Sequence, residues 1–389
     1  MNISINYPRR IQKVQASLAK HDIDVYISIR QASLHYLLGA FAPWRSAVVV
    51  PREGDAVAVL WNADAARLKT DTWFDDSRIV EWGDKQNPGF ITTIAKVIKE
   101  MGLGSKRVAA ELTCGGPRVA PGLMLAFEYQ QLLAALPDAT VVDGTDAVDE
   151  VMVVKEKEEI ELLRQAAAIG DVGLRAAIRE IEIGVTENHL AGVGELAMRD
   201  AGSDWSWSVT AGNEVGSGYR ASYPMGITQP ATEKLIQLGD MVILDFHPMY
   251  RLYCCDLTAN VIVGKPNAQQ QKLADVWQEA VQVLLRCMTP GSRVADAAIA
   301  ARKFVDEAGL GDYLWAAFGH GLGTDSRVPP LINEKSQELF LENMVVATGM
   351  HIYWPGVGGM RLELPTLVTP KGGNPLAKTP LYLQVLLDT

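Results

Sequence analysis

The stretch Leu238–Asn260, LGDMVILDFHPMYRLYCCDLTAN, constrains the fold most, because it predicts a buried strand that ends in a carboxylate. The apolar run MVIL follows the turn signal GD directly, which is typical of a buried strand. That run ends at Asp245, and a second run rich in β-formers, Leu252–Val263, carries Asp256. Two strands joined by a short connection bring these two carboxylates face to face. An aspartate at the end of a buried strand needs a cationic partner, and a metal ion supplies one.

Side chains two residues apart in a strand share a face. His247 is therefore expected to project with Asp245, and Thr258 with Asp256. This arrangement predicts carboxylates and an imidazole in one small space. The alternative is a pair of surface aspartates that flank a turn.

Composition limits the classes of protein and partner. The 389 residues are 48% apolar, which suits two domains with separate cores. The net charge is −10, and no cluster of Lys and Arg interleaves with aromatic residues, which argues against nucleic acid and anionic membranes as partners. No apolar run approaches the roughly 18 residues of a membrane span, and the start MNISINYPRR lacks the apolar core of a signal peptide. We therefore expect a soluble, cytoplasmic protein.

Strand and helix patterns alternate over the first 155 residues, which predicts an α/β domain. A helix is expected from Pro8 to His21, followed by the strands DVYISI, AVVVP and AVAVLW. The charged segment VKEKEE, residues 154–159, opens a long helical pattern. It marks the boundary to a second domain, residues 156–389.

The stretch Trp205–Pro224 has neither a helical nor a strand pattern and is dense in Gly, Ser, Trp and Tyr. Loops of this length inside a compact domain are more often binding loops than connectors. Its candidate substrate-binding residues are Tyr219, Arg220 and Tyr223.

Three later residues bear on chemistry, and each also has an ordinary structural explanation. His320 lies between two glycines, which expose its ring, although a lone histidine is often structural. The carboxylate of Glu363, in RLELP, can form an ion pair with Arg361 and have no other partner. His351 follows Gly349 by two positions and shares its face.

Together, Asp245, Asp256, the GHG around His320 and the GMRLE around Glu363 resemble the pita-bread metallohydrolases. These include aminopeptidase P, prolidase and methionine aminopeptidase, and the non-peptidase relatives creatinase, ectoine hydrolase and one class of dimethylsulfoniopropionate lyase. The resemblance covers the whole chain. It implies a creatinase-type N-terminal α/β domain, residues 1–155, and a C-terminal pita-bread α+β catalytic domain, residues 156–389.

Peptidases of this family hold two metal ions with two aspartates, a histidine and two glutamates. The fifth ligand position here is Gly349, and the histidine usually found in the upstream loop has no counterpart. His247 or His351 is the expected replacement, and mixed imidazole and carboxylate ligands suit a borderline transition metal. The resemblance thus implies one Zn, Fe, Mn or Ni ion per chain, with the candidate ligands Asp245, His247, Asp256, His320, His351 and Glu363.

The resemblance implies a metal-dependent hydrolase of the non-peptidase branch that cleaves a C–N bond in a small polar metabolite. The expected catalytic residues are His320, Arg327 and Glu363. Arg327 falls where the peptidases have a second histidine, and a guanidinium suits binding of an anionic or zwitterionic substrate. The alternatives are a divergent Xaa-Pro peptidase, a lyase acting by β-elimination, a metal-free creatinase-like enzyme and a binding protein without catalysis.

The resemblance also implies a homodimer. In creatinase-like relatives the N-terminal domain of one subunit covers the active site of the other. The segment LLGAFAPWRSAVVV places Trp44 and Arg45 where such relatives have an aromatic residue and an arginine. We expect one of them to reach the partner's site; the alternative is that both cap the edge of a strand.

Overall fold

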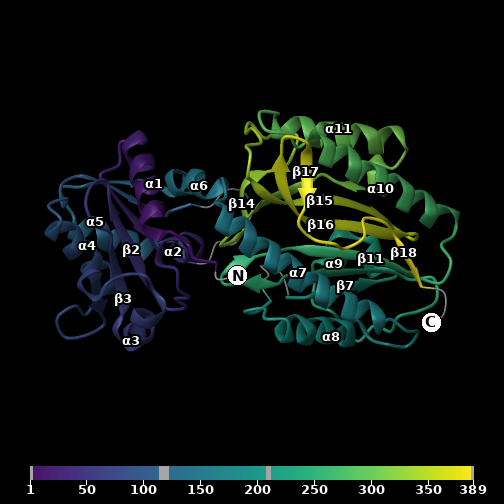
Figure 1. Cartoon of the computed structure of the whole chain (residues 1–389), viewed down its shortest axis with the longest axis horizontal. Helices are drawn as coiled ribbons and strands as arrows, with labels where there is room; N and C mark the ends of the chain where they lie inside the picture. Colours follow the sequence, from purple (N-terminus) through teal and green to yellow (C-terminus); the bar gives the residue numbers. More distant parts are fainter. Residues whose placement is uncertain (1–2, 114–121, 207–211, 387–389) are drawn as a thin grey trace. The chain divides into compact units, whose positions relative to one another are not determined.

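The computed structural model describes residues 3–113, 122–206 and 212–386, and of residues 326 and 327 only the backbone. The chain divides into two compact units, Met1–Met152 and Val153–Thr389 (Figure 1). No helix within the described ranges is long and apolar enough to cross a membrane. The expected binding loop lies outside these ranges at residues 207–211.

The first unit is a six-stranded sheet with helices on both faces, in the strand order β4-β3-β2-β1-β5-β6. Strand β2 pairs antiparallel with β1 and β3, and the outer pairings are parallel. The strands are β1 (Val25–Ser28), β2 (Ala47–Pro51), β3 (Val57–Trp61), β4 (Ile79–Trp82), β5 (Arg107–Ala110) and β6 (Thr140–Asp143). The helices are α1 (Tyr7–Lys20), α2 (Gln31–Leu38), α3 (Asn62–Asp71), α4 (Phe90–Glu100), α5 (Ala126–Ala135) and α6 (Thr145–Val153).

Each face of this sheet packs against its own core. Val48 and Val50 pack with Leu18 of α1, whereas Val49 packs with Ile94 of α4. A strand buried on both faces reads as a continuous apolar run, which explains AVVVP. The predicted α/β domain is confirmed. The sequence did not predict α2, because nearly all of its residues are buried and it lacks an amphipathic period.

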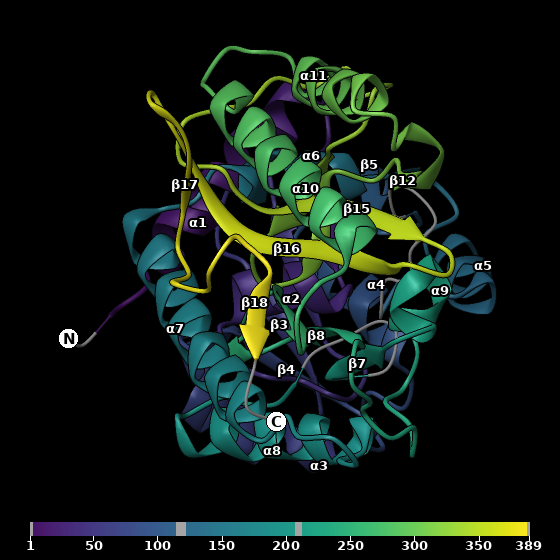
Figure 2. The ribbon, with the colours of Figure 1, turned by 90° about the vertical axis from the view of Figure 1, so that its right-hand side faces the viewer.

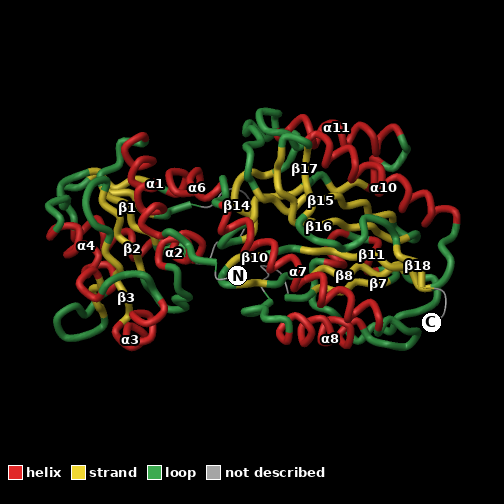
Figure 3. Tube along the Cα trace, viewed as in Figure 1, coloured by secondary structure: helices red, strands yellow, loops and turns green. Residues whose placement is uncertain are grey.

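The second unit contains a two-stranded sheet, β10-β9, and two larger sheets. The strand orders of the larger sheets are β18-β11-β8-β7 and β14-β13-β15-β16-β17, with β12 beside β15. Figures 2 and 3 show α7 and α8 on the side of the first of these two larger sheets and α10 and α11 on the side of the second. The helices are α7 (Lys157–Arg179), α8 (Glu187–Asp200), α9 (Pro224–Ile227), α10 (Ala268–Cys287) and α11 (Val294–Glu307). The strands are β7 (Glu214–Ser217), β8 (Met241–Phe246), β9 (Met249–Tyr250), β10 (Tyr253–Cys254), β11 (Leu257–Val263), β12 (Leu314–Trp315), β13 (Gly319–Leu322), β14 (Ser326–Leu331), β15 (Val345–Trp354), β16 (Gly358–Thr369), β17 (Gly372–Pro375) and β18 (Gln384–Leu386).

The strand expected at Leu252–Val263 is two strands, β10 and β11, and Asp256 lies between them. The chain turns before β10, where Arg251 and Leu252 adopt positive φ angles of 49° and 69°. Such left-handed backbone interrupts a strand. In the β8–β11 ladder the residue directly opposite Asp245 is Thr258, so Asp245 and Asp256 are not a directly facing pair of the ladder.

A buried charge network links three elements of the first unit. The Glu111 side chain, after β5, accepts hydrogen bonds from the backbone N–H groups of Ile29 and Arg30, at 2.7 and 2.6 Å. Arg30 Nε lies 3.2 Å from Glu111 Oε1, and the same guanidinium binds Asp149 on α6. All three charged side chains are buried. Removal of Glu111 would leave two backbone donors and a buried guanidinium poorly satisfied.

We predict that Glu111→Ala lowers the free energy of unfolding by about 3–5 kcal/mol, the usual cost of breaking a buried ion pair from one side. The measurement is denaturant unfolding of the full chain. Glu53→Ala, in an exposed turn, is the matched control. Equal unfolding midpoints for the two variants would contradict this role of Glu111.

Candidate metal centre

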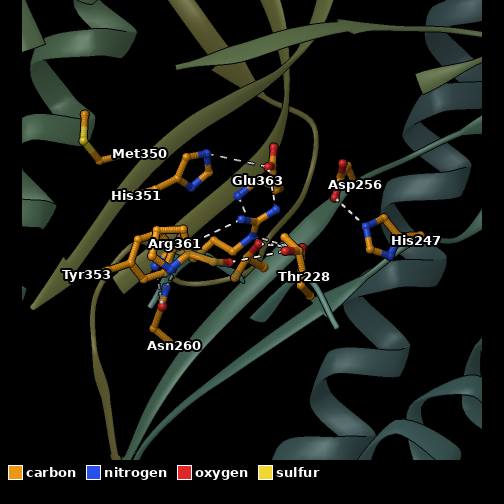
Figure 4. Close-up of polar contacts among 12 residues, drawn as sticks. Thr228, His247, Asp256, Asn260, Met350, His351, Tyr353, Arg361 and Glu363 are labelled. Atoms are coloured by element: carbon orange, nitrogen blue, oxygen red, sulfur yellow. Dashed lines mark hydrogen bonds and ion pairs between the residues drawn. The ribbon is translucent and has the colours of Figure 1, made fainter. Parts of the chain in front are cut away.

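Strands from both larger sheets of the second unit meet at the candidate site. Asp245 lies on β8, whereas Arg361 and Glu363 lie on β16. The side chain of Asn260 on β11 joins the two sheets: its amide donates to the Arg361 carbonyl at 2.7 Å, and its oxygen accepts from the Arg361 N–H at 2.9 Å. These paired bonds hold β11 beside β16 in a fixed register (Figure 4).

One buried guanidinium connects the two strands that carry the carboxylates. Arg361 Nε donates to Asp245 Oδ2 at 2.7 Å, and Nη2 donates to Glu363 Oε1 at 3.0 Å. Its Nη1 donates to the Tyr353 hydroxyl at 3.1 Å. The pairing of Glu363 with Arg361 therefore exists, but it is only one part of a larger network. Arg361 neutralises one charge and fixes the orientation of both carboxylates.

Asp256, His320 and Glu363 form a buried cluster whose ligand atoms lie within 4.8 Å of one another. His320 Nε2 lies 3.7 Å from Asp256 Oδ2 and 3.9 Å from Glu363 Oε2. Ligands of a tetrahedral ion lie about 3.3–3.6 Å apart when the metal–ligand bonds are about 2.0–2.2 Å. His320 Nδ1 lies 3.2 Å from the Gly321 carbonyl, and such a contact turns Nε2 towards a metal. The three residues fit a divalent transition metal.

His247 lies near Oδ1 of Asp256, whereas His320 lies near Oδ2. His247 Nε2 is 3.2 Å from Asp256 Oδ1, and its Nδ1 is 2.7 Å from the Gly212 carbonyl. Burial alone would lower the pKa of His247, but the charges of Asp256, Asp245 and Glu214 raise that pKa to about 10. Burial alone would raise the pKa of Asp256, but His247 and His320 hold it well below its usual range. Without an ion, therefore, protonated His247 supplies positive charge to Asp256.

Glu214 is a site residue that the sequence did not reveal. It lies on β7 directly opposite Asp245, and its ligand atom is within 4.8 Å of those of Asp245 and His247. Burial raises the pKa of Glu214 to about 8, and the nearby charge of Asp245 adds to this effect. Val215 is the only apolar residue in β7, so the strand has no clear sequence signal.

Charge at the site also favours a cation. Three buried carboxylates, Asp245, Asp256 and Glu363, lie near two cationic side chains, Arg361 and protonated His247, whereas the fourth buried acid, Glu214, keeps its proton at neutral pH because its pKa is raised to about 8. Burying excess negative charge is costly unless a cation or a proton compensates it.

The remaining candidate ligand and the candidate anion-binding arginine occupy different positions. His351 Nε2 lies 3.7 Å from Glu363 Oε1, on the side of Glu363 away from Asp256 and His247 (Figure 4). It is not part of the cluster of Asp256, His320 and Glu363. Position 327 lies on β14, but its side chain is outside the described part of the molecule.

The structure does not bring the expected substrate-binding residues of the loop into this cluster. Arg220 is buried and binds Glu187, with Nη1 donating to Oε2 at 2.6 Å. The same guanidinium donates to the carbonyls of Gly226 and Pro230. Arg220 therefore fastens its own loop. Tyr219 and Tyr223 are exposed.

Both candidates for the partner's site lie in the first unit. The Arg45 guanidinium binds Glu128 and the carbonyls of Gly122 and Leu123, which holds it within its own domain. The Trp44 side chain is 57% exposed and packs edge-on against Trp61 at 5.2 Å between ring centroids. Of the two, only Trp44 presents a largely open side chain.

Comparison with known proteins identifies both units. Residues 161–370 match the model of metallopeptidase family M24, and residues 10–154 match the creatinase/prolidase N-terminal domain. The chain is 32% identical over 234 residues to an Xaa-Pro dipeptidase of Pyrococcus furiosus, an alignment that covers 60% of this chain and 66%, just under two thirds, of that protein. It is 28% identical to the uncharacterized peptidase YqhT of Bacillus subtilis, over 97% of this chain and 100% of that protein.

A solved structure has the same fold. The Xaa-Pro dipeptidase from Bacillus anthracis superposes with a TM-score of 0.84 at 25% identity, covering 98% of this chain and all of that chain. The expected creatinase-type and pita-bread fold is therefore confirmed. These relatives are named as dipeptidases and peptidases, so the comparisons favour the peptidase alternative over the non-peptidase branch. Because the family model matches more than half of the chain, the protein belongs to metallopeptidase family M24 and carries a creatinase/prolidase N-terminal domain.

Proposed function

We propose that this protein is a metal-dependent hydrolase that cleaves the amide C–N bond of a small, zwitterionic, peptide-like substrate. Xaa-Pro dipeptides are the first class to test, because similar proteins are named as Xaa-Pro dipeptidases. The observation that carries the proposal is the buried cluster of Asp256, His320 and Glu363. Three protein ligands that leave further positions open are typical of a catalytic rather than a structural metal site.

The residues of the site have distinct tasks in this proposal. Asp256, His320 and Glu363 would hold the ion, which would supply Lewis acidity to the reaction. Arg361 keeps Asp245 and Glu363 at fixed distances from each other. His247 holds a proton at Nε2, 3.2 Å from Asp256 Oδ1, where it balances the carboxylate charge when no metal does. Preorganised ligands of this kind spare the site reorganisation during the reaction.

A second candidate function is C–N cleavage in a small metabolite that is not a peptide. It is favoured by Gly349 and Arg327, which stand where the family's peptidases have a glutamate and a histidine. A guanidinium with a pKa above about 12 does not act as a general base, but it binds a substrate carboxylate well.

We predict that the purified protein contains about one transition metal ion per chain, and that His320→Ala loses most of it, because imidazole ligands favour such ions. Elemental analysis after dialysis measures the content. The exposed His189→Ala is the matched control and should keep the metal. Metal-free wild-type protein with full activity in chelator would exclude a metal-dependent function.

We predict that the protein cleaves Xaa-Pro dipeptides and that a chelator stops this cleavage. Arg327→Lys should lower kcat/KM by about tenfold or more through a higher KM, since a lysine does not form the bidentate hydrogen bonds that an arginine makes with a carboxylate. Release of free proline measures the reaction. Dipeptides without proline serve as the substrate control. No cleavage of any dipeptide by metal-loaded protein would favour the non-peptide candidate.

We predict a homodimer in which Trp44 reaches the partner's site, because large exposed aromatic side chains are typical interface anchors. Sedimentation measures the assembly. A mixture of Trp44→Ala chains with Asp256→Ala chains, each impaired alone, should regain part of the activity by forming one intact site per hybrid. No recovery despite proven subunit exchange would mean that each chain completes its own site.

A further inference from the structure

The strand face opposite Glu363 has an unusual distribution of side chains. Gly349 and His351 are two residues apart on β15, so they share a face of the sheet. Gly349 pairs directly with Glu363, and His351 pairs with Arg361. The position facing the carboxylate therefore carries no side chain, whereas the next position on the same face carries an imidazole.

The imidazole of His351 occupies the space that a side chain at position 349 would need. A Cβ atom built on Gly349 would lie 2.8 Å from His351 Nε2, closer than real Cβ contacts allow. It would also lie 3.1 Å from Gly319 N and 3.2 Å from the Ala317 carbonyl. The backbone of Gly349 does not have a positive φ, so its conformation does not require glycine. The space beside Gly349 is therefore taken by the His351 imidazole and by the backbone of residues 317 and 319.

The two oxygens of Glu363 face different groups. Oε1 accepts a hydrogen bond from Arg361 Nη2 at 3.0 Å and lies 3.7 Å from His351 Nε2. Oε2 faces His320 Nε2 at 3.9 Å. At 3.7 Å the contact with His351 is electrostatic and steric rather than a hydrogen bond. Glu363 is therefore held from one side so that its other oxygen faces the metal ligands.

We propose that His351 replaces the side chain absent at position 349 and acts as a positioning residue for Glu363, holding Oε1 so that Oε2 stays turned towards His320 and Asp256. This inference rests on the metal site of the proposed function. It separates the two histidines near the site: His247 contacts Asp256, and His351 supports Glu363 from the opposite side. Gly349 and His351 then form one unit, in which neither residue is replaceable alone.

Cobalt(II) binding tests the proposal without relying on activity. Affinity is measured by competition with a chromophoric chelator, and the cobalt absorption spectrum reports the ligand geometry. His351→Ala and the larger His351→Gln should both weaken cobalt binding by about ten- to a hundred-fold, the usual effect of losing an outer partner of a metal ligand. The stoichiometry at saturating cobalt should not change, because Asp256, His320 and Glu363 remain. His189→Ala is the matched histidine control.

Position 349 provides an independent arm. Gly349→Ala should weaken cobalt binding although no polar group is removed, because its methyl group displaces the imidazole. Gly192→Ala is the matched control, since a Cβ there meets no atom within 4 Å. The double variant Gly349→Ala with His351→Ala should bind cobalt no more weakly than His351→Ala alone, because the added methyl group then has no imidazole to displace. If the two residues act independently, their effects on cobalt affinity should instead add.

The outcomes distinguish this inference from the proposed function. If wild-type protein binds no cobalt, the metal site itself is wrong. If wild-type protein binds cobalt and both His351 variants bind it within about twofold of wild type, well below the usual effect of an outer partner, the positioning role is overturned. Additive weakening of cobalt binding in the folded double variant Gly349→Ala with His351→Ala, judged folded by its thermal unfolding, would overturn it as well.

Discussion

The candidate site depends on the contact of the buried Arg361 guanidinium with Asp245 and Glu363. Two carboxylates from different strands would repel each other in a buried space, and desolvation would strengthen that repulsion. The rigid guanidinium donates to both at 2.7 and 3.0 Å, and its third contact, to Tyr353, fixes its own position. Asn260 adds two backbone-directed hydrogen bonds at the same point. The two sheets therefore meet in one defined register.

The charge balance of the site follows from this contact. Arg361 offsets only part of the negative charge of the surrounding carboxylates, and the remainder makes Asp256 and Glu363 strong ligands for a cation. The metal-free protein uses protonated His247 for this purpose, as the raised pKa of about 10 indicates. Metal affinity in general depends on pH at sites built from titratable ligands.

The chain belongs to the M24 family, and the side chains around the candidate site set its local shape and charge. Position 349 has no carboxylate, but an imidazole from position 351 fills the space. Glu214 adds a buried carboxylate on the other side, next to Asp245 and His247. These residues set the shape and charge of the site, and substrate choice is sensitive to both. Membership of the family and the choice of substrate are therefore separate questions for this protein.

The sequence by itself determined the two-part fold and the identity of the main ligand candidates. Apolar runs such as AVVVP and MVIL mark buried strands, and Asp245, Asp256, His320 and Glu363 occur in local patterns that are visible without a structure. Local patterns identify strands because burial depends on the side chains of the strand itself.

Only the tertiary structure decided which partner each of these residues contacts. Glu214 has no local signal, since its significance comes from pairing with Asp245, 31 positions later in the numbering. The separate roles of His247 and His351 depend on distances across strands, which residue spacing does not specify. The sequence made Arg220 a candidate for substrate binding, but in the structure its guanidinium binds Glu187. Contacts between distant segments arise when the sheets pack, so the partner of a buried charge is set by the whole fold rather than by its neighbours in the chain.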